Sequence, residues 1–493
     1  MANDREFIIQ PLITEGKVVK GSDIDFNTTY AQIGVWQSNQ QQAGSPGNSF
    51  PSYAIALSEL AGSPNFKNYL VVDQLYGNDA TAQAYNFNLP YSTIDAAIAA
   101  AQPRDLIIVN PGPFGYGVNV NVLSKNLSFY LYDKTFVYFS SATSSNPGIS
   151  LNIYGKGDII FASGIIAEDY FDGSIDIECN NITFNDITFL TPYSYANPEN
   201  RTFRIRAKNF TQNGQAGILY SFPWILDIDV ENYYSSVYGP GSYGLANFWL
   251  GYNSGINNQP ASRIKIKYAN VFCPLNGYPQ DSPSFVNIAA GSPDYNFFLD
   301  IESLLINNTI AGSNIGAPFL FRVGPTSGNF FINVKQGYLN NYTILYDQAY
   351  PDAHALIEGK YYINNSASEA IFTPLAVQAM TVESRADIIA LIYKTNSILN
   401  VSNQGKVDLI GGKLINQDGV NGIGIQKSSG SSISVLRLKD VKIIAPSSFI
   451  GALPGEALEI YSAYTNSNPV NYANTLAPST TWVVNALMSD NNF

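Results

Sequence analysis

Ile175-Asp-Ile-Glu178 is a short segment in which apolar and polar residues alternate, the pattern of a strand with one buried face. Six later segments repeat this pattern at steps of 23 to 38 residues: Phe203-Arg-Ile-Arg206, Leu226-Asp-Ile-Asp229, Ile264-Lys-Ile-Lys267, Leu299-Asp-Ile-Glu302, Ile332-Asn-Val-Lys335 and the looser Ala355-Leu-Ile-Glu358. An element that recurs while its connections vary in length is typical of a solenoid.

The last residue of each segment is charged, and the sign alternates from one segment to the next: Glu178, Arg206, Asp229, Lys267, Glu302, Lys335 and Glu358. If each strand lies parallel on the previous one, about 4.8 Å away, opposite charges in such a column attract. We therefore predict a structural charge ladder on one outer face, with successive Cα atoms about 5 Å apart. A second column, two residues earlier, runs Asp176, Arg204, Asp227, Lys265, Asp300 and neutral Asn333. The alternative is that these charges belong to unrelated solvated faces.

The composition argues against several classes of function. Charged residues make up only 13% of the 493 residues, and the net charge is -12, so the basic footprint that nucleic acids require is missing. Cys179 and Cys273 lie far apart in strand-like runs, and we expect both to be buried free thiols. No metal spacing, phosphate loop or nucleophile elbow is present in the sequence, so we predict no metal and no cofactor.

The chain before the repeats contains a low-complexity stretch, Gln37-Ser-Asn-Gln-Gln-Gln-Ala-Gly-Ser-Pro-Gly-Asn48, within an N-terminal region, 1–72, that we interpret as an attachment region. A short helix is expected within 90–102, with Ser92 as its N-cap and an apolar stripe made by Ile94, Ala97, Ile98 and Ala101. The strand Leu106-Ile-Ile-Val109 and the turn Asn110-Pro-Gly-Pro113 follow.

Together, Gly77-Asn-Asp, the helix Leu89-Pro-Tyr-Ser-Thr-Ile-Asp-Ala-Ala-Ile-Ala-Ala-Ala101 and Asp105-Leu-Ile-Ile-Val-Asn-Pro-Gly112 resemble the start of the right-handed parallel β-helices of phage tailspikes and fibres and of pectate-lyase-like proteins. The resemblance implies a helix that caps the open end of the coil, where core and strand edges would otherwise be exposed. It also implies a homotrimer.

The expected fold is therefore all-β: a right-handed parallel β-helix solenoid with an N-terminal attachment region, a capping helix and a small C-terminal β tail. We divide the chain into a virion-attachment region (1–72), a lead-in segment with the capping helix and first strands (73–125), the parallel β-helix (126–447) and a C-terminal capping or tail segment (448–493). The pattern in 365–396 fits helix and strand equally well.

Paired carboxylates are the only residues that suggest catalysis. Three pairs stand two apart on a strand face: Asp176 with Glu178, Asp227 with Asp229, and Asp300 with Glu302. Their separation, roughly 6.5 to 7 Å at the backbone, suits acid-base hydrolysis of sugars. In the predicted ladder, however, these acids have basic neighbours (Arg204, Arg206, Lys265 and Lys267), which would lower their pKa and make them poor general acids. The one histidine, His354, carries no catalytic signature.

Aromatic residues in the long connections suggest binding instead. Rings beside Asn and Asp offer the stacking faces and hydrogen bonds that sugar recognition uses, and the candidates for glycan binding are Tyr233, Tyr234, Tyr238, Tyr243, Trp249 and Tyr252. The alternative is that these rings pack loop on loop or across a trimer interface.

The function that we expect is that of a structural, non-enzymatic virion protein: a phage spike, fibre or decoration protein that presents its β-helix outward and binds a host-surface glycan. Its expected partners are two further copies in a homotrimer, other virion proteins through residues 1–72, and host cell-surface polysaccharide; nucleic acid and membrane are not expected. The first residues, from Met1 to Phe7, show no secretion signal and no apolar run is long enough for a membrane span, so we expect assembly in the host cytoplasm. The alternative is a polysaccharide depolymerase, hydrolase or lyase, of the tailspike type.

Overall fold

The computed structural model is built from parallel strands, with one helix among the residues that it describes. These residues are 6–7, 19–20, 69–86, 88–119, 122–140, 143–144, 149–162, 174–185, 188–190, 201–214, 218–220, 224–237, 246–250, 262–273, 284–288, 295–308, 319–324, 327–347, 352–365, 375–393, 397–401, 405–416, 423–427, 435–444, 448–451, 457–465, 482–484 and 487–489.

The chain divides into two compact units, which we describe separately. Unit 1 comprises Met1–Thr183 and Arg204–Lys208, and unit 2 comprises Phe184–Phe203 and Asn209–Phe493. Strands β12 (Ile175–Asn185) and β14 (Arg201–Gly214) contribute residues to both units.

Unit 1 contains two series of parallel strands, one strand of each series per repeat. The first series is β3 (Tyr69–Val72), β4 (Asp105–Val109), β7 (Leu127–Leu131), β10 (Leu151–Gly155) and the first half of β12. The second is β5 (Tyr116–Val118), β8 (Phe136–Phe139) and β11 (Asp158–Phe161). Between the two series lie buried rings, including Phe129 beside Phe139 and Phe139 stacked on Phe161. Short pairs elsewhere join β1 (Glu6–Phe7) to β2 (Val19–Lys20), antiparallel, and β6 (Val122–Leu123) to β9 (Thr143–Ser144).

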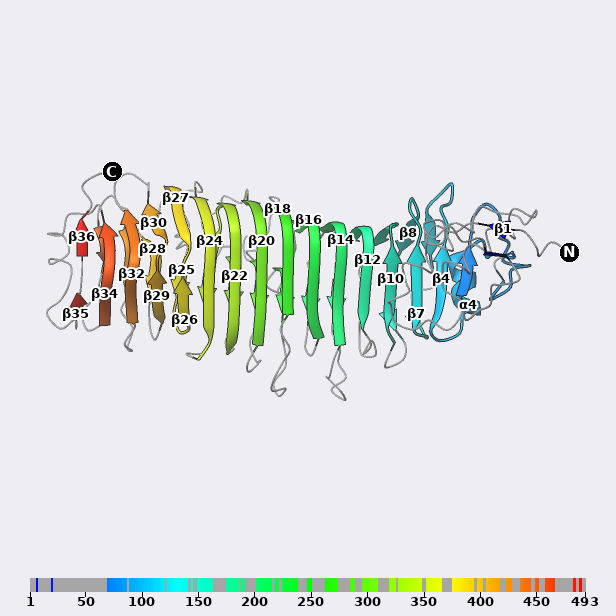
Figure 1. The fold of residues 1–493 in the computed structure, drawn as a ribbon, viewed down its shortest axis with the longest axis horizontal. Coiled ribbons are helices and arrows are strands. Elements are labelled where there is room, and N and C mark those ends of the chain that lie inside the picture. Colours follow the sequence, from blue (N-terminus) through cyan, green and yellow to red (C-terminus); the bar gives the residue numbers. More distant parts are fainter. Residues whose placement is uncertain are drawn as a thin grey trace. The chain divides into compact units, whose positions relative to one another are not determined.

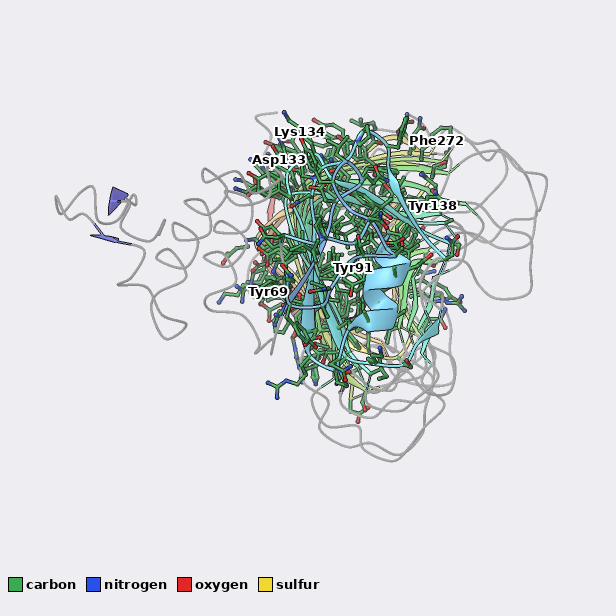
Figure 2. All side chains as sticks on the ribbon, turned by 90° about the vertical axis from the view of Figure 1, so that its right-hand side faces the viewer. Tyr69, Tyr91, Asp133, Lys134, Tyr138 and Phe272 are labelled. Carbon is green, nitrogen blue, oxygen red and sulfur yellow. The ribbon has the colours of Figure 1, made fainter. Side chains whose placement is uncertain are left out.

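Helix α4 (Ile94–Ala100) lies where the sequence predicts a capping helix, and it packs on β3, β4 and β5. Its apolar stripe is buried as expected, at Ile94, Ala97, Ile98 and Ala101. The predicted N-cap was wrong by one residue: Thr93, not Ser92, caps the helix and accepts a hydrogen bond from the Ala96 amide. Figure 2 shows the helix with Tyr91 beside it, in front of the strands of this unit.

Both ends of α4 are held by side chains from neighbouring segments. The Asp79 carboxylate accepts hydrogen bonds from the amides of Ser92 and Thr93, at the N-terminal end of the helix. At the other end, Lys125 Nζ donates to the carbonyl groups of Ile98, Ala99 and Ala101. A cation at the C-terminus of a helix satisfies free carbonyls and complements the helix dipole.

Unit 2 alternates a long strand with a short one, and each kind pairs in parallel with the next of its kind (Figure 1). The long strands are β14, β16 (Trp224–Val237), β18 (Ser262–Cys273), β20 (Tyr295–Asn308), β22 (Gly328–Asn340) and β24 (His354–Asn365). The short strands form a separate ten-stranded sheet: β13 (Thr188–Leu190), β15 (Ile218–Tyr220), β17 (Ala246–Leu250), β19 (Ser284–Ile288), β21 (Phe319–Val323), β23 (Thr343–Asp347), β25 (Leu375–Val377), β28 (Ser397–Val401), β31 (Ile423–Lys427) and β33 (Ser448–Gly451).

Each long strand has two halves with separate burial patterns. In β20, Phe297, Leu299 and Ile301 are buried, then two consecutive residues are not, and Leu304 and Ile306 are buried again. Because successive side chains of a strand point to opposite faces, two non-buried residues in a row shift the alternation by one position. Each half therefore presents its own outward face.

After β24 the two halves become separate strands. Strands β26 (Thr381–Ser384) and β27 (Asp387–Tyr393) pair in parallel with the first and second halves of β24. The described part of the ambiguous segment 365–396, residues 365 and 375–393, therefore forms strands and not a helix. The same split recurs in β29 (Lys406–Ile410) and β30 (Lys413–Asn416), before β32 (Val435–Ile444) rejoins the halves. Gly359, at φ +105°, lies between the halves of β24, where a Cβ would overlap the backbone of Val334.

The parallel pairing extends beyond the limits predicted for the repeats. In unit 1 it begins at Tyr69, so β3 belongs to the sheet and not to the N-terminal region 1–72. In unit 2 it continues into the predicted tail, through β34 (Ala457–Thr465), β35 (Trp482–Val484) and β36 (Leu487–Ser489). The fold is thus mostly parallel β, with many consecutive strands stacked in chain order, an arrangement compatible with a β-helix solenoid.

Candidate functional site

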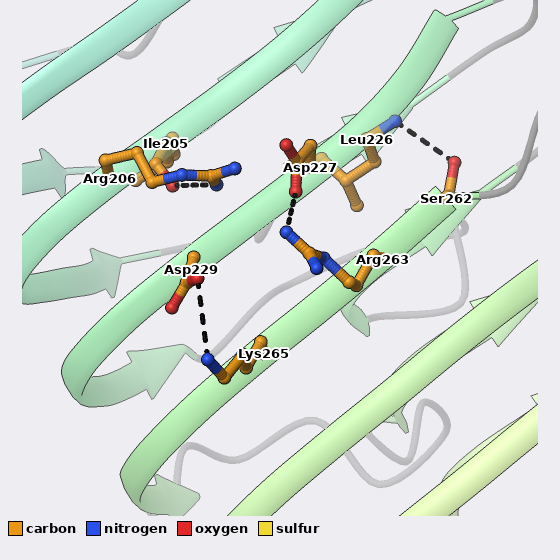
Figure 3. A network of polar contacts seen from close by, with 8 residues as sticks. All are labelled: Ile205, Arg206, Leu226, Asp227, Asp229, Ser262, Arg263 and Lys265. Carbon is orange, nitrogen blue, oxygen red and sulfur yellow. Dashed lines mark hydrogen bonds and ion pairs between the residues drawn. The ribbon is translucent and has the colours of Figure 1, made fainter.

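Oppositely charged side chains pair between neighbouring strands, but the register of β16 and β18 differs from that of the predicted ladder. Asp229 is level with Lys265, not with Lys267, and Asp227 is level with Arg263. The ion pairs follow this register: Asp227 to Arg263 at 3.2 Å and Asp229 to Lys265 at 3.8 Å (Figure 3). Lys267 instead contacts Glu231, at 3.7 Å. A slip of two residues keeps every side chain on its own face, so alternation alone could not reveal the error.

A second correction concerns Glu358, which pairs with Asn333 and not with Lys335. An irregularity between Val334 and Gly337 shifts the register there. The column that starts at Asp229 is therefore Lys265, Asp300, Asn333 and Glu358. The Asn333 amide donates to Asp300 at 2.8 Å, and Arg385 contacts Glu358 at 3.4 Å. The predicted neighbours Lys267, Glu302 and Lys335 do lie level with one another, because the residues on either side of each are paired in that register.

In unit 1, a cluster of four polar side chains from three strands is centred on Asp176. Asp176 and Glu178 stand on β12, Tyr154 on β10 is level with Glu178, and Arg204 on β14 contacts Asp176 at 3.0 Å, as the second column predicts. Only 14% of the Asp176 side chain is exposed, and its Oδ1 has no hydrogen-bond partner among the described residues. The Tyr154 ring is buried in a cluster with Ile108 and Tyr130.

The electrostatics of this cluster contradict the expectation that basic neighbours lower the pKa of every carboxyl in the ladder. Burial raises the pKa of Asp176 above its ordinary value, and the charge of Glu178 adds to the rise; Arg204 opposes it without cancelling it. Burial and the Asp176 charge also raise the pKa of Tyr154. Because burial disfavours the charged form of an acid, Asp176 holds its proton to a higher pH than an exposed aspartate does.

This arrangement has the elements of an acid-base pair. A carboxyl that keeps its proton can act as a general acid, and Glu178, an exposed residue two positions along the same strand, could act as the base. The other predicted pair, Asp227 and Asp229, lies opposite Arg263 and Lys265 and is more exposed.

In Figure 3 the Arg206 guanidinium lies against the backbone, where it donates to the Ile205 carbonyl at 3.2 Å. The sequence analysis missed Tyr154. The one feature of the sequence that could have indicated it is its position directly after a segment in which apolar and polar residues alternate.

Of the six predicted glycan-binding residues, the structure describes the side chains of two, Tyr233 and Tyr234, and these differ in burial. Tyr233 is wholly buried: its hydroxyl bonds to Gln212, and its ring packs on Phe210, Phe248 and Phe285, so its assignment to a binding surface was wrong. Tyr234 points outward and is 45% exposed. Trp249 belongs to strand β17, and its side chain is not described; Tyr238, Tyr243 and Tyr252 lie outside the described residues.

The histidine and the described cysteine occupy different environments. His354 begins β24 at an exposed position, and the thiol of Cys179 is buried with a raised pKa; the Cys273 side chain lies outside the described residues. Within the described part of the chain, no three His, Cys, Asp or Glu residues gather as metal ligands do. None of the described helical segments has the length and apolar character of a membrane span.

Comparison with protein-family models, with curated proteins and with solved structures finds no match to this chain.

Proposed function

We propose that this chain is a right-handed parallel β-helix and serves as a structural protein of a phage particle: a spike, fibre or decoration protein. The observation that carries the proposal is the parallel pairing of strands from β3 to β12 together with the helix that packs on β3, β4 and β5. It supports the resemblance of residues 77–112 to the start of phage tailspike and fibre coils.

The acids of unit 2 favour a structural role over catalysis. Asp227, Asp229, Asp387 and Asp408 each contact a cation, at 3.2 to 3.8 Å, on a neighbouring strand. Each of these pairs links two neighbouring strands, as expected for charges that stabilise a stack.

In the proposed assembly, residues N-terminal to β3 attach the chain to other virion proteins, the chain forms a homotrimer, and the outward surface contacts host polysaccharide. Because Tyr69–Val72 pairs with β4, the attachment region ends before Tyr69.

Deletion of residues 1–68 tests the attachment. The shortened chain should keep the circular dichroism and melting transition of the full chain and yet be missing from purified particles. The matched control is a full-length chain with Asp408→Asn, which should fold and be incorporated. Incorporation of the truncated chain at the full-length level would refute attachment through this region.

A second function, polysaccharide cleavage, is favoured by one observation, the raised pKa of Asp176 beside Glu178. It predicts that purified protein releases oligosaccharides from bacterial surface polysaccharide and that Asp176→Asn abolishes the release, while Asp408→Asn retains it. Intact polysaccharide after incubation with the wild-type protein would exclude this alternative for the polysaccharide tested.

A further inference from the structure

The second halves of the long strands in unit 2 carry a continuous column of outward apolar side chains. We call it the apolar stripe; it consists, in register order, of Tyr234, Asn270, Leu305, Tyr338, Tyr362, Ile389, Ile415 and Ile444. Asn270 is its only polar member. At about 4.8 Å per strand the stripe runs for roughly 34 Å.

Tyr234, Asn270, Leu305 and Tyr338 of the stripe are exposed, and its other four members are partly exposed, although soluble surfaces rarely leave such a column uncovered. Leu305 is 43% exposed and Tyr338 is 42% exposed, and Tyr338 stacks on Tyr362 with ring centres 4.9 Å apart. Tyr268, Phe272 and Leu391 add exposed apolar surface on strands of the same stack. With roughly 200 Å² per large side chain, the exposed members and these neighbours present about 500 Å². This is near the upper end of the range for the largest apolar patch of a monomer, and such patches are often functional.

Charge is arranged around the stripe as it is around an interface. Its edge carries Lys360, Asp387, Lys413 and Lys442, which follow one another in register, with Asp387 and Lys413 paired at 3.8 Å. The first halves of the same strands carry the charged columns. An apolar centre with a charged rim is typical of protein interfaces.

We infer that the apolar stripe is the contact surface between copies of this chain. The stripe repeats at the strand spacing over eight strands, and a second copy carries the same side chains at the same period, so the two columns can interdigitate along their whole length. The partly exposed Tyr362, Ile389, Ile415 and Ile444 enlarge the covered area towards the roughly 800 Å² per partner of a stable interface. The inference rests on the proposed homotrimer and names the face that forms it.

The test is the oligomeric state of the purified chain with Leu305→Lys, measured by sedimentation velocity over a range of micromolar concentrations. The matched control is Phe298→Lys, on the same strand, because Phe298 is also 43% exposed but lies level with Arg263 in the first half. The wild type and Phe298→Lys should associate, and Leu305→Lys should weaken association at least tenfold. A monomeric wild type, or equal association of the two variants, would overturn the inference.

A second measurement decides the case in which Leu305→Lys does not fold. Tyr338→Cys should be joined to a second copy by a short bismaleimide, whereas Phe298→Cys should not. Equal cross-linking of both variants, or of neither, counts against the stripe. Failure of the inference is distinct from failure of the virion role. Copies joined through the stripe but missing from particles would contradict only the virion role, whereas monomers present in particles would contradict the stripe and the homotrimer but not the virion role.

Discussion

Arg204 contacts Asp176 at 3.0 Å, yet the pKa of Asp176 is higher than that of an exposed aspartate. The desolvation of the carboxyl by burial outweighs the attraction of the guanidinium, which is itself partly exposed to water. Among the described charged columns, Asp176 is the acid whose pKa is raised although a cation lies beside it.

The raised pKa of Asp176 predicts how stability changes with pH. Between the unfolded and the folded pKa the native state binds more protons than the unfolded state, so the free energy of unfolding decreases as the pH rises through that window. The contribution of Asp176 is thus most favourable below its unfolded pKa, near 4. Urea unfolding between pH 3 and pH 7 should show wild type losing stability relative to Asp176→Asn as the pH rises. A difference that stays constant, or that changes in the opposite sense, would show that the folded pKa is not raised.

The corner of β24 requires glycine. Gly359→Ala would place a side chain at φ +105° and against the Val334 backbone, and we expect it to lower the free energy of unfolding by about 3 kcal/mol or more. Gly411→Ala is the control, because Gly411 also has a positive φ of +68° but has open space around it; it should cost only about 1 kcal/mol. Equal losses in chemical denaturation would mean that the close approach to Val334 does not matter.

Reversing one charge tests the corrected register. Asp229→Lys places a cation level with Lys265, and it should destabilise unit 2 by roughly 0.5 to 1 kcal/mol, less at high salt, because the pair is partly exposed. The double variant Asp229→Lys with Lys265→Asp should recover the loss. If Lys267→Asp recovered the loss and Lys265→Asp did not, the register first predicted from the sequence would be correct.

Helix α4 should be necessary for a soluble chain. Ile98→Asp buries a carboxylate against β3, β4 and β5 and should cost about 3 kcal/mol or more, with aggregation as the visible result. Ala99→Asp, on the exposed side of the same helix, is the control and should leave light scattering and the melting transition nearly unchanged. A soluble Ile98→Asp variant of wild-type stability would show that the helix does not cover the core.

The sequence predicted those features that depend on local pattern. Alternation identified the strands, and the helical spacing of Ile94, Ala97 and Ile98 identified the helix. In both cases the period of the apolar residues indicates which side is buried. Register could not be read in this way, since a shift of two residues leaves Lys265 and Lys267 on the same face.

Properties that depend on several strands at once could not be predicted from the sequence either. The two consecutive non-buried residues Glu231 and Asn232 shift the alternation, so that Tyr233 turns into the core and Tyr234 outward. The pKa of Asp176 depends on its own burial, on Arg204 from a neighbouring strand and on Glu178. Such effects follow from three-dimensional packing and leave no fixed spacing in the sequence.

The proposal that the chain is a component of a phage particle is tested most directly by locating it in intact particles. Antibodies against the purified chain, used in immunogold electron microscopy of density-purified particles, should label one fixed position on each particle and should not label particles that lack the gene. Particles that carry no label, while the free chain remains in the lysate, would contradict the account.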